Sequence, residues 1–505
     1  NHMASYCTSE SVEEIRIHME NIFNKVTDKK KFKKSIRTLR RNVINLNSFC
    51  VGFVRSLHRQ DWRNYDPPES TYMIKLVMDI FSAHPFTIKE GIEGLIKSVH
   101  TLSEVAHRKV ILDEISLMLS FLVDICPLSK SYLLDSLSEN LPFYTRPKPY
   151  IVNFFSFLFA ILKNIPELRV YIYSLIIQSL IHIDTELPKQ KIERNIKFLN
   201  TMKQKNISIE SVYKKFKNVE KSTLLWIETC DKFDDIMLLC FQIFSSTFEI
   251  MQDDTSFYHD LRTAFLEKIL TCRGLIAVHF IWFYFCSRSQ TFLELTLSDL
   301  WSKFSDVNEA IHIRHVSLTH ISGILARGLF IQFEIFETYI RLMFSWVDNY
   351  INGHKESTVP FAPPTCQMGF PVHHLFFVVC QSLFYSLIWW DKSVNRDNED
   401  ILKWIKFLST LDFDRIILSK LNPLYYCSPA ISQNIAKIGK DYEIFYAYHV
   451  IARNSKVLSI FNALEKSFSS DTYVNILNPE SSCNFPYDPY VLPSTKHLIE
   501  SVYKE

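Results

Sequence analysis

Two glycines in the C-terminal half have the spacing of a nucleotide-binding loop. Gly323 and Gly328 are separated by four residues, as in a P-loop. A P-loop continues with a lysine and a serine or threonine, which hold the phosphates and magnesium, whereas here Leu329 and Phe330 follow. The glycines are therefore predicted to allow close packing of helices. Since the sequence also has no Gly-x-Gly-x-x-Gly, Gly-x-Ser-x-Gly or His-Glu-x-x-His motif, we expect neither an enzyme nor a cofactor.

Three histidines are the best candidates for a metal site. His312, His315 and His320 could share one face of a helix. No cysteine or acidic residue stands at a matching spacing, and a zinc site usually needs four ligands. We therefore predict a solvated or hydrogen-bonded helix face and no metal. The adjacent His373 and His374 begin an apolar stretch and are interpreted as structural.

The sharpest charge feature lies near the N-terminus. Residues 29–41 contain no acidic residue. Their basic residues are Lys29, Lys30, Lys31, Lys33, Lys34, Arg37, Arg40 and Arg41. Phe32, Ile36 and Leu39 interleave at helical spacing, which predicts a helix that packs these three side chains and solvates its basic face. A nuclear-import signal, or a contact with nucleic acid or an acidic partner, is the functional alternative.

Composition favours long helices. The chain of 505 residues is 47% hydrophobic and 22% charged, so it can form a large core. Its 9 glycines are far fewer than average usage predicts, which leaves few tight hairpins or left-handed positions. The net charge of +2 gives no overall signal for nucleic acid or membrane. The 11 cysteines include no Cys-x-x-Cys pair, so we expect reduced core thiols in an intracellular protein.

Apolar residues recur with the period of a helix, and prolines punctuate the segments. Ile111, Ile115, Met118, Leu122 and Ile125 form one such stripe before Pro127. A spacing of about 40 residues per helix pair fits a divergent HEAT-like repeat. We therefore predict an all-α, HEAT-like solenoid over residues 1–505. Its N-terminal half would cover about residues 4–188 and its C-terminal half about 222–505. Discrete helical domains joined by linkers are the alternative.

Three segments depart from this helical pattern. The basic segment at about 189–221 is expected to be mobile and to lie outside the core. Residues 355–371 contain four prolines and a glycine and cannot form a regular helix. Residues 478–493 are predicted to lie as extended chain across the last helices. The longest apolar runs, at 274–286 and 375–390, are shorter than the roughly 20 residues that span a bilayer, so no membrane partner is expected.

Five collinear motifs between about residues 45 and 495 carry a family resemblance. They are Asn47-Ser48 through Asp66-Pro67-Pro68 with Trp62, the apolar run 175–187 with Ile183-Asp184-Thr185-Glu186, the segment Ile321–Arg327, the segment Phe376–Tyr385 with Gln381, and the C-terminal pair Ser419–Cys427 and Asn484–Pro489. Their order resembles that of the RNA polymerase I-specific transcription initiation factor family, TIF-IA and its yeast counterpart.

These motifs also have plain structural meanings. Residues 183–187 should end a helix with Asp184 and Glu186 exposed. Asn422-Pro423 should stop one helix and open the next. Gln381 lies in an apolar helix, so it needs a buried hydrogen-bond partner.

The resemblance implies a helical-repeat adaptor without catalysis or cofactor. Such a protein would bind RNA polymerase I near its stalk subunits and link it to promoter-bound core factor at ribosomal DNA, in the nucleus and nucleolus. The family's polymerase-binding serine face matches Ser48, Ser82, Ser129 and Ser131, which we expect to be exposed on one side of the N-terminal half. Some doubled serines of the family are single here. Many members carry a long acidic insert where this chain has its basic segment 189–221.

Two further hypotheses stay open. One is a generic nuclear helical-repeat scaffold or transport receptor. The other is direct nucleic-acid binding through residues 29–41 and 189–221, which would be secondary to protein binding.

Overall fold

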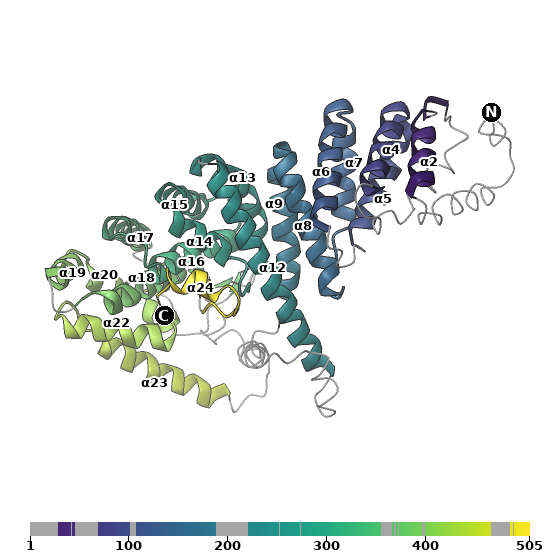
Figure 1. Cartoon of the computed structure of the whole chain (residues 1–505). Coiled ribbons are helices and arrows are strands. Elements are labelled where there is room, and N and C mark those ends of the chain that lie inside the picture. Colours follow the sequence, from purple (N-terminus) through teal and green to yellow (C-terminus); the bar gives the residue numbers. More distant parts are fainter. Residues whose placement is uncertain are drawn as a thin grey trace. The chain divides into compact units, whose positions relative to one another are not determined.

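The structure is a computed structural model. It describes residues 29–41, 43–45, 69–100, 108–187, 221–251, 253–272, 274–354, 366–367, 370–371, 373–395, 399–465, 485–487 and 489–504. Within these ranges the chain is almost entirely helical, which confirms the predicted all-α fold class (Figure 1). The described strands are β1 (Cys366–Gln367) and β2 (Phe370–Pro371), an antiparallel pair with Cys366 opposite Pro371. They lie in the segment 355–371 that was predicted not to form a regular helix.

The chain divides into two compact units. Unit 1 contains residues 1–187, 206–250 and 259–264, and unit 2 contains residues 188–205, 251–258 and 265–505. The predicted single solenoid over the whole chain stays a prediction. The basic segment 189–221 lies outside the described residues, apart from the first residue of helix α12.

Unit 1 is built from stacked helix pairs. Its helices are α2 (Lys29–Arg41), η2 (Val43–Asn45), α4 (Glu69–Ala83), η5 (Pro85–Thr87), α5 (Ile88–His100), α6 (Arg108–Ile125), α7 (Ser129–Glu139), α8 (Lys148–Asn164), η6 (Pro166–Leu168), α9 (Arg169–Thr185) and most of α12 (Lys221–Met251). Helices α2, α4, α6 and α8 pack in sequence as one row, and α5 packs against α7 (Figure 1). This is the antiparallel pair stacking expected of a helical repeat.

Apolar periodicity explains why these helices pack. Ile111, Ile115, Met118 and Leu122 of α6 are all buried, as their spacing predicted. Ile125 was predicted to continue that stripe, but it is 63% exposed. The reason is that α6 ends at this residue, and the turn at Cys126-Pro127 redirects the chain.

Unit 2 is centred on α16 (Ile311–Arg327) and α18 (His374–Ser393), which pack against each other. Around them lie α13 (Asp254–Ala264, shared with unit 1), the π-helical turn η7 (Phe265–Ile269), α14 (Phe280–Arg288), α15 (Gln290–Ser305), α17 (Phe333–Gly353), α19 (Glu399–Ser409), α20 (Phe413–Ile417), α21 (Pro423–Tyr426), α22 (Pro429–Asp441), α23 (Tyr448–Glu465) and α24 (Lys496–Glu500). Its core is rich in aromatic rings, and Trp282 stacks on Phe265 with centroids 4.0 Å apart.

Two of the family motifs form buried polar contacts, and one of them opens a helix as predicted. The backbone N–H of Ser428, which caps α22, donates to the buried Gln381 Oε1 at 2.9 Å. Asn422 adopts a left-handed φ of 46° immediately before α21, which begins at Pro423 as predicted, but the preceding helix α20 already ends at Ile417 and is not stopped by Asn422. Its side-chain amide exchanges two hydrogen bonds with that of Asn454, at 2.8 and 3.1 Å. These contacts give the buried amides of Gln381 and Asn422 hydrogen-bond partners within the fold.

The Ile-Asp-x-Glu motif departs from its prediction. Helix α9 ends at Thr185 and Glu186 is exposed, as expected. Asp184, however, is fully buried, so the prediction that it is exposed is wrong. Its position on α9 turns it toward the core, together with Ile183 and Leu187.

The described cysteines are free thiols. Five of them, Cys230, Cys240, Cys286, Cys380 and Cys427, are buried. Burial raises the pKa of Cys230 and of Cys286 to about 12, so both stay protonated and unreactive at neutral pH. Their burial agrees with the expectation that cysteines lie in the core. Among the helices that the structure describes, none combines the length and apolar character of a membrane span.

Candidate docking edge and neighbouring sites

Three equivalent proline turns mark one edge of unit 1. Pro85, Pro127 and Pro166 each join the two helices of a pair and recur about every 40 residues. Each turn is closed by the same backbone hydrogen bond, from the N–H of the second residue after the proline to the carbonyl of the residue before the proline. The bonds are Thr87 N–H to His84 O (3.0 Å), Ser129 N–H to Cys126 O (2.8 Å) and Leu168 N–H to Ile165 O (3.1 Å). This recurrence is the internal repeat, although the sequence shows no clean repeat apart from the prolines.

The turns lie next to one another because successive pairs stack in the same orientation. Thr71 in the first turn of α4 donates to Glu114 in the N-terminal half of α6, at 2.7 Å. An ion pair of 3.2 Å joins Lys130, after the second turn, to Glu167 in the third. We call this side of unit 1 the proline-turn edge, defined by the residues around Pro85, Pro127 and Pro166.

Two of the four predicted serines are exposed at this edge. Ser82 lies three residues before Pro85 and its Oγ donates to Met78 O at 2.9 Å. Ser131 lies four residues after Pro127 and its Oγ donates to Leu128 O at 2.9 Å. Ser48 lies outside the described residues.

The prediction that Ser129 is exposed is wrong. Its side chain is fully buried, and its Oγ donates to Leu122 O at 3.2 Å. Thr87 occupies the equivalent position of the preceding turn, and it too is buried, with its Oγ1 donating to His84 O at 2.8 Å. Ser129 is therefore a turn-forming residue that closes the end of α6.

An exposed apolar stripe, which the sequence did not reveal, accompanies these serines. Its members are Leu117, Phe121, Ile125 and Leu128, which are 47, 61, 63 and 60% exposed. They follow one another at helical spacing along α6 into its turn, opposite the buried stripe of the same helix. Phe86, in the preceding proline turn, is 52% exposed. Large apolar side chains grouped in this way on a surface are typical of an interaction site.

The basic segment forms helix α2, as predicted. Ile36 and Leu39 are buried, whereas the side chains of Lys29 to Phe32 lie outside the described residues. Arg40 makes a bidentate ion pair with Asp79 of α4, in which Nε donates to Oδ2 at 2.5 Å and Nη2 donates to Oδ1 at 3.3 Å. Among the side chains of α2 that the structure describes, the exposed cations are Lys34, Arg37 and Arg41, and Lys33 is half-buried. The predicted basic residues therefore have two roles: Arg40 attaches the helix to α4, whereas Lys34, Arg37 and Arg41 face solvent.

Two of the three candidate metal histidines, His315 and His320, are hydrogen-bonded within the protein, and His312 is half-buried. His320 is buried, its Nδ1 lies 2.9 Å from the hydroxyl of Tyr487, and burial lowers its pKa to about 3. His315 Nδ1 lies 3.0 Å from His374 Nε2, and His373 Nδ1 lies 2.8 Å from the Tyr350 hydroxyl. No group of three or more metal-ligating side chains occurs in the part of the chain that the structure describes. These contacts agree with the predicted hydrogen-bonded helix face.

Gly323 and Gly328 have a different role from the one predicted. A Cβ at Gly323 would lie 2.7 Å from Pro486 O and 2.8 Å from Tyr487 Cδ2. Gly328 forms a bridge with Tyr503. Gly323 therefore makes room for the C-terminal segment, described at 485–487 and 489–504, and not for a second helix, whereas a Cβ at Gly328 would meet Ile324 O and Ile331 Cγ1 of its own turn, both at 2.9 Å. We call residues 485–487 and 489–504 the C-terminal clasp.

The clasp also corrects a second expectation. Residues 478–493 were predicted to lie across the last helices, but those that the structure describes pack on α14, α16 and α18 through Phe485 and Tyr487. Tyr487 is fully buried against Phe280 and Phe283, with ring centroids 5.4 and 5.0 Å away. The backbone of the clasp continues to α16, where Lys504 N donates to Arg327 O at 2.7 Å and Leu329 N to Val502 O at 2.9 Å.

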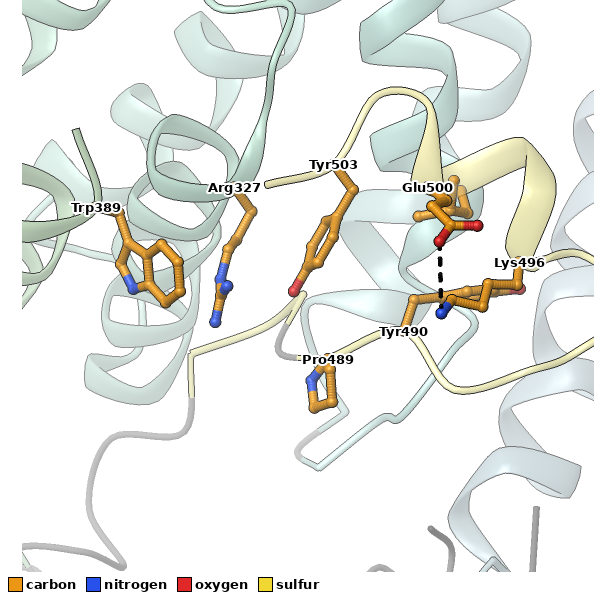
Figure 2. A pocket seen from close by; sticks show the side chains of 8 residues that line it. Arg327, Trp389, Pro489, Tyr490, Lys496, Glu500 and Tyr503 are labelled. Carbon is orange, nitrogen blue, oxygen red and sulfur yellow. Dashed lines mark ion pairs between the residues drawn. The ribbon is translucent and has the colours of Figure 1, made fainter. Parts of the chain in front are cut away.

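A pocket of about 310 Å³ lies where the clasp meets α16 and α18 (Figure 2). Arg327 lies between the rings of Trp389 and Tyr503, with its guanidinium carbon 3.4 and 5.4 Å from their centroids. Its Nε donates to Tyr385 and its Nη1 to Lys504 O, both at 3.1 Å. Because Arg327 uses its charge and donors within the protein, its role is to hold the clasp.

Comparison with known proteins gives a consistent result over the whole chain. The family model described as "RNA polymerase I specific transcription initiation factor RRN3" matches residues 4–505. A mouse RNA polymerase I-specific transcription initiation factor RRN3 is 25% identical over 75% of this chain, and the match spans 58% of the mouse protein. A fission-yeast (Schizosaccharomyces pombe) protein of the same description is 21% identical over 92% of this chain and 78% of its own length.

A solved structure supports the fold. The crystal structure of RNA polymerase I transcription initiation factor Rrn3 superposes with a TM-score of 0.69, covering 94% of this chain and 90% of that one. At 20% identity, this similarity supports the shared fold alone.

Proposed function

The chain belongs to the RNA polymerase I-specific transcription initiation factor RRN3 family, and we propose that it acts as a polymerase I initiation factor of the adaptor type. It would bind RNA polymerase I near the stalk subunits and recruit the enzyme to promoter-bound core factor at ribosomal DNA. Its site of action would be the nucleus and, within it, the nucleolus. The proteins of this family are named as transcription initiation factors and not as enzymes, so surface complementarity replaces catalysis in this proposal.

The observation that carries the proposal is the proline-turn edge. Ser82 and Ser131, which match the family's polymerase-binding serines, are exposed at two equivalent turns. Beside them run the exposed side chains of Phe121, Ile125 and Leu128. Burying a large apolar side chain contributes roughly 1.5–3 kcal/mol, and small hydroxyls let a partner approach at little desolvation cost. The edge therefore combines an apolar contact with serines that can be modified.

Phosphorylation of these serines would oppose docking. A phosphate adds roughly −1.5 to −2 charges and three oxygens that must remain hydrated or find an arginine. Placed unpaired in a buried interface, it should cost several kcal/mol, enough to weaken binding by orders of magnitude. Ser131 lies in the first turn of α7, where the helix N-terminus stabilises negative charge. Its modification would therefore leave the fold intact and act on the interface.

Selective retention of polymerases tests this proposal. Immobilised protein is incubated with nuclear extract of the same organism, and the bound polymerases are identified by their largest subunits. The proposal predicts retention of polymerase I and exclusion of polymerases II and III. Equal retention of all three, or binding of transport factors without polymerase I, would identify a generic nuclear scaffold and refute the proposal.

A further inference from the structure

Helix α2 presents a basic surface whose residues are not among those that define the proline-turn edge. Lys34, Arg37 and Arg41 are exposed and lie at helical spacing opposite the buried Ile36 and Leu39. With a rise of 1.5 Å per residue, these three cations extend over about 10.5 Å of the helix axis. They form a straight charged stripe on one face of unit 1.

Helix α4 extends this surface beside the stripe. Lys75 is exposed on α4, and Lys33 of α2 lies 5.2 Å from the centroid of the Tyr72 ring. A hydrogen bond from Lys33 lowers the pKa of the Tyr72 hydroxyl, and the charges of Arg37 and Lys75 lower it further. Cations from two helices therefore converge on one place.

The ion pair between Arg40 and Asp79 fixes the orientation of this surface. Asp79 accepts two hydrogen bonds from Arg40, so its carboxylate is satisfied within the protein. The pair ties the end of α2 to α4, which holds the stripe in place instead of leaving it on a loose peptide. The sequence of α2 contains no acidic residue that would offset the remaining cations.

We propose that Lys34, Arg37 and Arg41 of α2, with Lys75 of α4, form a binding surface for the phosphate backbone of duplex DNA. Duplex DNA carries about one negative charge per 1.7 Å, so a stripe of this length faces about six phosphate charges. The exposed side chains described on α2 are Lys34, Arg37, Thr38 and Arg41, none of which is apolar. A protein interface is centred on buried apolar anchors, whereas backbone contact with DNA is electrostatic and independent of sequence.

Such a surface gives a defined salt dependence. Three or four phosphate contacts predict a slope of roughly −2.7 to −3.6 in log affinity against log salt. Between 50 and 200 mM salt, the affinity for a duplex should therefore fall about 40- to 150-fold. This dependence separates backbone binding from an apolar contact, which salt does not weaken.

Fluorescence anisotropy with the full chain and a labelled 20-bp duplex of arbitrary sequence tests the surface. The variant Lys34→Glu/Arg37→Glu/Arg41→Glu should bind at least about tenfold more weakly at 50 mM salt, and its slope should be shallower by about 2.7. The neutral variant Lys34→Gln/Arg37→Gln/Arg41→Gln should lie between it and the wild type. Because all three side chains are exposed, the melting temperatures should agree.

A matched control distinguishes the stripe from overall charge. Lys403→Glu/Lys437→Glu/Lys440→Glu reverses three exposed lysines of unit 2 and should bind the duplex like the wild type. If the control variant bound the duplex as weakly as the α2 variant, the loss of affinity would follow from net charge alone and the proposal would be overturned. Absence of duplex binding by the wild type at 50 mM salt would also overturn it. Displacement of the duplex by polyglutamate at equal or lower charge concentration would instead assign the stripe to an acidic protein partner.

Discussion

Replacing Tyr487 should show that the C-terminal clasp is part of the core of unit 2. The ring of Tyr487 is fully buried among His279, Phe280, Phe283 and His320, with ring centroids 4.8 to 5.4 Å away. Removing a buried aromatic ring and leaving a cavity costs about 3–5 kcal/mol. We therefore expect Tyr487→Ala to lower the free energy of unfolding by that amount.

The hydroxyl contributes a separate part of this stabilisation. Tyr487 OH lies 2.9 Å from His320 Nδ1, and both groups are buried. Tyr487→Phe keeps the ring but leaves the imidazole nitrogen without this partner, which costs about 1–3 kcal/mol. The backbone N–H of Tyr487 donates to His279 Nε2 at 2.9 Å, and this bond is independent of the side chain. The phenylalanine variant should therefore lie between the wild type and the alanine variant.

Urea unfolding followed by circular dichroism measures these differences. Tyr446→Ala is the matched control, because Tyr446 is 59% exposed and its loss should change the free energy by less than about 0.5 kcal/mol. If Tyr487→Ala were destabilising by less than 1 kcal/mol, the clasp would not be a core element. Equal effects of Tyr487→Phe and Tyr487→Ala would show that the buried ring itself contributes nothing.

Three further predictions concern buried contacts of unit 2, and each is measured by urea unfolding. Burial lowers the pKa of His320 to about 3 from its ordinary 6.5, so only the unfolded chain takes up this proton as the pH falls below about 6.5. The associated stability should decrease by about 2 kcal/mol between pH 7 and pH 5, and His320→Asn should remove that part of the pH dependence. Gly323→Ala places a Cβ 2.7 Å from Pro486 O and should destabilise by about 1–3 kcal/mol, whereas no loss would mean that the clasp can move aside. Asn454→Ala leaves the buried amide of Asn422 without two hydrogen bonds and should cost about 1–3 kcal/mol, so an unchanged midpoint would contradict their role.

Local rules predicted the parts of the fold that depend on neighbouring residues. The basic helix with Ile36 and Leu39 buried, the start of α21 at Pro423 and the need of Gln381 for a buried partner all follow from spacing, proline geometry or hydrogen-bond satisfaction. The family motifs were informative for the same reason, since they encode helix ends and buried polar pairs. The partner of Gln381, the N–H of Ser428, could not be predicted because the two residues meet only in the folded chain.

Long-range packing explains the incorrect predictions. Gly323 was assigned to helix packing because the sequence gives no sign that Pro486 and Tyr487 return to it. Ser129 resembles an exposed serine after a proline, yet the turn folds its hydroxyl onto Leu122 O. Recurrence of Pro85, Pro127 and Pro166 was a usable signal for the repeat. The exposed stripe on α6 could not be predicted from the sequence, because its residues are as apolar as those of the buried stripe.

The central claim is that the proline-turn edge docks RNA polymerase I, and the affinity of purified polymerase I for a phosphomimetic pair tests it most directly. Ser82→Asp/Ser131→Asp should weaken binding by at least about tenfold with an unchanged melting temperature. Ser246→Asp/Ser409→Asp, which alters two exposed serines elsewhere, should bind like the wild type. Wild-type affinity of Ser82→Asp/Ser131→Asp, or equal weakening by both pairs, would contradict the assignment of this edge as the docking surface.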